Sequence, residues 1–143
     1  MTAPSDWSDR ANKRQNVNEL QNVVISTRAA LGLPIPIRGM LCLPGATAEC
    51  LKDALSSGLI DRNTFILAVE REPEIRPKVI AAIRELGFSN FLVRACSLEE
   101  LPPTGFEGCM DFIHADLMGY PTTKMTHWLR DYMPAFLSSQ GMF

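Results

Sequence analysis

The sequence contains no apolar run approaching the ~20 residues that a membrane-spanning helix needs. Its polar start, MTAPSDWSDRANKRQ, also lacks the apolar core of a signal peptide. We therefore expect a cytoplasmic protein that makes no membrane contact. The net charge of −2 is too small to attract nucleic acid to the protein as a whole, although a local basic patch would still allow such binding.

Motifs for hydrolysis, for nucleoside triphosphates and for metals are missing as well. There is no Walker loop, no Ser-His-Asp arrangement and no C-x-x-C pair. The two histidines, His114 and His127, lie thirteen residues apart without an evident third ligand, so we expect no metal site. Three of the four cysteines stand in or beside apolar segments, which favours buried, reduced thiols over a disulfide.

The chain has 143 residues, 46% of them apolar, which is enough for one domain with a substantial core. We expect residues 1–16 to be a flexible segment and residues 17–143 to form the domain. Short apolar runs of strand type alternate with helical patterns, as is typical of an α/β sandwich with a mostly parallel sheet. The expected strands are Met40–Leu43, Phe65–Val69, Phe91–Val93 and Met110–Ala115.

The first expected helix precedes these strands. It begins at Val17 and places Leu20, Val23, Val24 and Leu31 on one apolar face, which we expect to cover the sheet.

The last helix is followed by only a few residues. Its apolar stripe, from Met125 to Phe136, predicts a core or interface position, and Pro134 is expected to bend its end. Ser138–Gly141 is interpreted as a turn, and Met142 as the first residue of a fifth strand. The sheet is therefore expected to be incomplete on its C-terminal side, with its edge covered by a second copy or another protein partner.

Residues 38–71 carry the main functional signal. The strand Met40–Leu43 ends at Pro44 and Gly45, a helical pattern follows, and the strand Phe65–Val69 ends in the acid Glu70. Two apolar strands joined by an amphipathic helix indicate a right-handed β-α-β crossover, with the turn and Glu70 both at the strands' carboxyl ends. Small ligands bind at that edge of an open parallel sheet.

The order and spacing of these strands and loops resemble the first four strands and loops of the class I S-adenosylmethionine-dependent methyltransferases, over about two thirds of the chain. The resemblance implies a Rossmann-like three-layer sandwich that binds S-adenosylmethionine. In that family the first loop receives the methionine part of the cofactor, which here assigns Pro44, Gly45 and Ala46 to it.

The resemblance also implies roles for the later loops. Glu70, followed by Arg71, stands where the family holds the ribose hydroxyls. Ser97 and Leu98 belong to the loop that reads the adenine. Asp116 and Tyr120 follow the fourth strand, where the family lines the methyl-transfer site, and Asp116 would orient an amine acceptor or take its proton. The same residues also have structural interpretations, as a strand-end acid and as capping or packing residues.

This sequence departs from the family pattern in ways that keep a second function open. The first loop has one glycine instead of two or three, the acid often found in the third loop is missing unless Glu99 reaches back, and later strands have no counterpart. The alternative is a non-catalytic methyltransferase-like module that works in a protein assembly. A dinucleotide is the competing ligand, but G-x-G-x-x-G is absent and Glu49, in the first turn of the helix, opposes a pyrophosphate. The methyl acceptor stays open.

Overall fold

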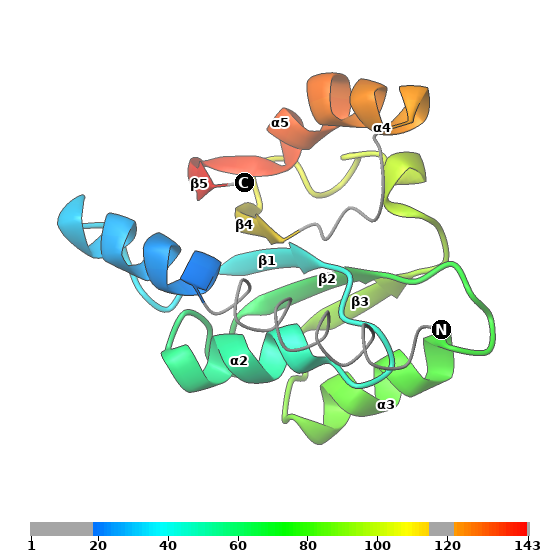
Figure 1. Ribbon diagram of the computed structural model, residues 1–143, viewed down its shortest axis with the longest axis horizontal. Coiled ribbons are helices and arrows are strands. Elements are labelled where there is room, and N and C mark those ends of the chain that lie inside the picture. The colour runs from blue at the N-terminus through cyan, green and yellow to red at the C-terminus, as the bar shows by residue number, and fades with distance from the viewer. Residues whose placement is uncertain (1–18, 115–121, 143) are drawn as a thin grey trace, which may run out of the picture.

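The computed structural model describes residues 19–114 and 122–142. Within these residues five parallel strands form one sheet in the order β3-β2-β1-β4-β5 (Figure 1). The strands are β1 (Gly39–Cys42), β2 (Phe65–Val69), β3 (Phe91–Arg94), β4 (Met110–His114) and β5 (Leu137–Met142). The expected α/β fold with a parallel sheet is confirmed. Strands that are apolar on both faces need cover on both sides, and the helices that connect parallel strands provide it.

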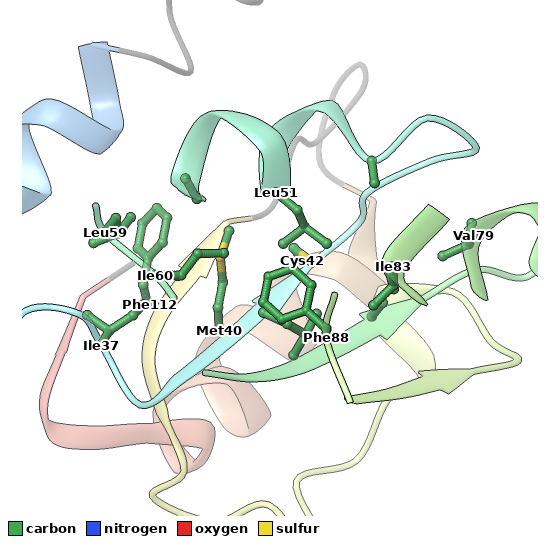
Figure 2. Close-up of a cluster of buried hydrophobic side chains, with 14 of the residues drawn as sticks. Ile37, Met40, Cys42, Leu51, Leu59, Ile60, Val79, Ile83, Phe88 and Phe112 are labelled. Carbon is green, nitrogen blue, oxygen red and sulfur yellow. The ribbon is translucent and has the colours of Figure 1, made fainter. Parts of the chain in front are cut away.

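Helices cover both faces of the sheet. The helix over residues 19–30, α2 (Glu49–Ser57) and α3 (Arg76–Glu85) lie on one face, and the C-terminal helical segment lies on the other (Figure 1). Alternate strand residues face opposite sides. Met40 and Cys42 therefore pack under α2 (Figure 2), whereas Leu41 packs towards Trp128 on the other side.

The helix over residues 19–30 buries a different face from the one that the sequence predicted. Leu20, Val23 and Leu31 are 40%, 57% and 67% exposed, whereas Val24 is buried together with two polar side chains, Gln21 and Arg28. Hydrogen bonds explain the difference. The Gln21 amide donates to the carbonyl of Cys50 at 3.2 Å, and the Arg28 guanidinium donates to the carbonyls of Pro34 at 3.0 Å and Gln140 at 2.8 Å. Apolar periodicity alone does not register such bonds.

The predicted turn at Ser138–Gly141 is wrong, because these residues form the middle of β5. Their side chains and carbonyls have specific partners across the fold: the Ser138 hydroxyl donates to Asp111 on β4, and the Gln140 carbonyl accepts from Arg28. Tertiary contacts thus override weak strand propensity. The edge of β4, which we expected to be open, is covered by β5 of the same chain.

The C-terminal helical segment comprises α4 (Thr123–His127), the π-helical η2 (Trp128–Tyr132) and α5 (Met133–Phe136). The wide turn lies directly before Pro134, whose ring clashes with the carbonyl four residues earlier and which has no N–H to donate. Trp128 and Phe136 are buried, which confirms the predicted core stripe, and Trp128 Nε1 donates to the carbonyl of Leu101 at 2.9 Å. In the part of the chain that the structure describes, no helix has the length and apolarity to cross a membrane.

Candidate functional site

The candidate site lies at the carboxyl edge of the sheet, where the order of connection reverses. Successive strands run β1, β2, β3 in one direction, and the chain then crosses back to place β4 on the other side of β1. Cys42, at the end of β1, is level with Ala68 of β2 and with His114 of β4. Such a switch point is where open parallel sheets form their ligand crevice, because neighbouring loops turn away from one another there.

The loop between β1 and α2 begins at this point. Pro44 is buried, Gly45 is partly exposed with a φ of 68°, and Ala46 is exposed. Among the described residues, a side chain at Gly45 would meet no atom within 4 Å. The glycine is therefore favoured by its positive φ and not by crowding, and there is open space beside the loop. Ala48, the N-cap of α2, is also left-handed, with a φ of 55°, an unfavourable conformation for a residue with a side chain.

Glu70 stands at the end of β2, next to this loop in the order of the sheet. Its backbone N–H donates to the Arg94 carbonyl at 3.0 Å, and its Oε2 accepts from the N–H of Glu72 at 3.1 Å. Arg71 points outward, with its side chain 70% exposed, and pairs with Glu72 at 3.4 Å. The carboxylate is thus fixed at the edge by its own turn and remains partly exposed.

The third loop, after β3, forms η1 (Leu98–Glu100). Ser97 and Glu100 make a capping box, in which the Ser97 N–H donates to Glu100 Oε1 at 3.2 Å and the Ser97 hydroxyl also bonds to that oxygen. These bonds, the hydroxyl bond foremost, hold the pKa of Glu100 below its ordinary value. Leu98 is 2% exposed, with its side chain in the core under the C-terminal helix. It can therefore present only backbone to a ligand.

Asp116 and Tyr120, the two candidate residues after β4, lie outside the described residues. Within the described ranges, no group of three histidine, cysteine or acidic side chains is placed to hold a metal ion. His127, on α4, binds Asp131 at 2.7 Å on the far side of the fold from α2.

Sequence reasoning missed a cluster at the switch point. Cys50, at the second position of α2, packs against the buried cluster that contains Cys42, and the ring of His114 stacks on Phe112 of the same cluster at 5.8 Å. The neighbouring Cys42 thiol is the main cause that lowers the pKa of Cys50 to about 6. Burial opposes the shift, and the His114 ring and the Leu51 N–H add to it. The interaction with Cys50 raises the pKa of Cys42.

No protein-family model and no curated protein sequence matches the chain. A crystal structure from Galdieria sulphuraria, of a protein assigned as a sarcosine dimethylglycine methyltransferase, is 16% identical, with a TM-score of 0.55 over 84% of this chain and 43% of that one. The chain has a methyltransferase-like fold. That fold agrees with the family resemblance of the sequence at the level of architecture.

Two structures from Pyrococcus horikoshii are similar over a smaller part of the chain. One is TYW2 in complex with MeSAdo, at 13% identity and a TM-score of 0.49 over 73% of this chain and 35% of that one. The other, described as a transferase, has 12% identity and a TM-score of 0.48 over 73% and 36%. The chain spans less than half the length of each of these three proteins.

Proposed function

We propose that this chain binds S-adenosylmethionine at the carboxyl edge of its sheet and acts as a methyltransferase-type domain. The observation that carries the proposal is the position of the loop Leu43–Ala48 and of Glu70, which follow adjacent parallel strands beside the switch point. A loop with open space beside its glycine and a partly exposed carboxylate one strand away are the two features that an adenosyl ligand with a ribose diol requires.

The residues fit this cofactor in different ways. The loop around Gly45 has space for the methionine part, and the Glu70 carboxylate accepts hydrogen bonds from the ribose hydroxyls, beside the exposed Arg71. Ser97 and Leu98 contribute the backbone of the third loop to the adenine. Once bound, the cofactor supplies a methyl group already activated on a sulfonium, so the protein contributes mainly positioning.

The choice of S-adenosylmethionine over a dinucleotide depends on α2. Glu49 lies in the first turn of this helix, and its charge opposes a pyrophosphate at the helix N-terminus. The N-cap, Ala48, has no side chain that competes for the first amides of the helix. A zwitterionic methionine end tolerates the carboxylate because it carries an ammonium group.

The acceptor side of the reaction belongs to the proposal as well. Asp116 and Tyr120 are the candidates for orienting an acceptor or taking its proton, which are modest demands for an activated methyl donor. A second copy of the chain or another protein partner is the proposed source of further acceptor contacts, with the exposed edge strands as its docking place.

Isothermal titration with S-adenosylmethionine and S-adenosylhomocysteine tests the proposal. We expect micromolar binding, weakened about 10- to 100-fold in Glu70→Ala, because each hydrogen bond to a charged group contributes about 1.5–3 kcal/mol. Glu74→Gln, which changes an exposed acid four residues away, is the matched control and should leave the affinity unchanged.

Two results would contradict the proposal. No heat with either ligand, from a chain shown to be folded by circular dichroism, would exclude the cofactor and favour the non-catalytic module. The single glycine of the loop and the buried Pro44 fit that alternative. An equal loss of affinity in Glu70→Ala and Glu74→Gln would place the ligand elsewhere.

A further inference from the structure

Three chemically active side chains meet beneath the first turn of α2. Cys42 comes from the end of β1, His114 from the end of β4, where it is the register partner of Cys42, and Cys50 from α2. Cys50 packs against the same buried cluster as Cys42, and both Cys42 and His114 are close enough to it to lower the pKa of its thiol. Cys42 is fully buried in the core shown in Figure 2, whereas Cys50 is partly exposed. Cys50 therefore lies nearer the surface than Cys42.

The surroundings of Cys50 favour its thiolate. Among the described residues, the titratable groups that face it are the Cys42 thiol and the His114 imidazole, and the Leu51 N–H of its own helix adds a further hydrogen bond. The helix over residues 19–30 contributes the neutral Gln21, whose Nε2 donates to the Cys50 carbonyl at 3.2 Å. A partly exposed thiolate at a helix N-terminus beside a histidine is the arrangement found in reactive cysteines.

We propose that Cys50 and Cys42 form a peroxide-reactive dithiol, in which Cys50 is the nucleophile, Cys42 is the resolving thiol and His114 is the positioning residue. The oxidant is a hydroperoxide. The Cys50 sulfur attacks one peroxide oxygen, the O–O bond breaks, and the second oxygen leaves as an alcohol or as water after taking a proton. Cys50 is then a sulfenic acid.

The second step closes the bridge. The sulfur of Cys42 attacks that of Cys50, the S–S bond forms, the S–O bond breaks, and the leaving hydroxide takes the Cys42 proton as water. Overall, two thiols are oxidised by two electrons and the hydroperoxide is reduced. The interaction with Cys50, which together with burial raises the pKa of Cys42, loses its charged partner once Cys50 is a neutral sulfenic acid.

The bridge also spans the loop Leu43–Ala48. If the proposed function holds, a disulfide between Cys42 and Cys50 ties this cofactor loop to β1, and we expect binding of S-adenosylmethionine to weaken on oxidation. This consequence depends on the proposed function, whereas the thiol chemistry does not.

Mass spectrometry of the intact chain tests the chemistry directly. In a Cys96→Ser/Cys109→Ser background, equimolar hydrogen peroxide should remove two hydrogens from the mass, and peptide mapping should show a bridge between Cys42 and Cys50. In Cys42→Ala, and in Cys42→Ser if the first variant does not fold, Cys50 should gain one oxygen and react with dimedone. A bridge that persists without Cys42, or dimedone labelling absent from both variants, would overturn the proposal.

The pH dependence of the oxidation rate should show whether Cys50 reacts as a thiolate. With a pKa of about 6, Cys50 should react almost equally fast at pH 7 and pH 8. The same cysteine in the urea-unfolded chain, with an ordinary thiol pKa of about 8.5, should speed up about eightfold over that interval. His114→Gln should restore part of that pH dependence in the folded chain. An equal pH dependence in the folded and unfolded chains would refute the role of the cluster.

A titration separates this proposal from the proposed function. The reduced and bridged forms are each titrated with S-adenosylmethionine. A bridge that forms in a chain whose reduced state binds no cofactor contradicts the proposed function and leaves the dithiol established. Binding to the reduced chain with no peroxide-dependent change in mass contradicts the dithiol alone.

Discussion

The buried carboxylate of Asp111 should make the stability of the protein depend on acid pH. Asp111 is 1% exposed, and its Oδ2 accepts from the backbone N–H of Arg38 at 2.9 Å and lies 3.5 Å from the Arg38 guanidinium. Burial alone would raise the pKa of Asp111. The Ser138 hydroxyl and the two Arg38 groups outweigh burial and lower that pKa below its ordinary value.

The sign of the effect follows from this shift. Because the folded state holds the proton on Asp111 less tightly than the unfolded state does, the stabilisation is present above the unfolded pKa of about 3.9. It is lost as the pH falls through the lower, folded pKa. Asp111→Asn removes the charge and turns an amide donor towards other donors, which should lower the free energy of unfolding at pH 7 by about 2 kcal/mol. For a domain of this size the melting temperature should fall by about 4–8 °C.

Urea denaturation followed by circular dichroism, at pH 7 and at pH 3 or below, provides the measurement. The gap between the wild type and Asp111→Asn should shrink as the pH falls through the lowered pKa of the folded wild type, because the wild-type carboxylate is then itself protonated. Glu85→Gln, at an exposed position, is the control and should stay within about 0.5 kcal/mol of the wild type. A gap at pH 7 as small as that of the control, or one that stays undiminished in acid, would refute the reasoning.

Changing either of two glycines to alanine should lower the free energy of unfolding, for a different reason at each position. Gly58 caps α2 with a φ of 83° and has open space where a side chain would go, so Gly58→Ala should lower the free energy of unfolding by about 1–2 kcal/mol through backbone strain alone, measured as the urea midpoint. Gly39, in β1, faces the carbonyl oxygen of Cys109, so the methyl group in Gly39→Ala should force the strands apart and lower that free energy by about 3 kcal/mol. Equal losses in the two variants would show that the contact at Gly39 does not matter.

The strands were predictable because two properties of their residues, apolar character and side-chain bulk, indicate the same buried environment. In β2, continuous apolar character and bulk both indicate a strand covered on two faces, and its bounds, Phe65–Val69, are those expected. The prediction failed for the buried face of the first helix, where apolar residues do not mark the core side. Leu20 and Val23 face outward, because the hydrogen bonds of Gln21 and Arg28 decide the orientation of their helix.

The candidate site could be predicted only as far as strand order determines it. Gly45 and Glu70 follow neighbouring strands, so a parallel crossover places both at one edge whatever the details of packing. The relation between Cys42 and His114 is different, because it depends on the register of β1 against β4, which are separated by two intervening strands in sequence. A shift of one residue would turn His114 to the opposite face, away from Cys50. The position of His114 beside Cys42 therefore becomes visible only once the register is known, and the experiment on His114→Gln tests whether this neighbour matters to the chemistry of Cys50.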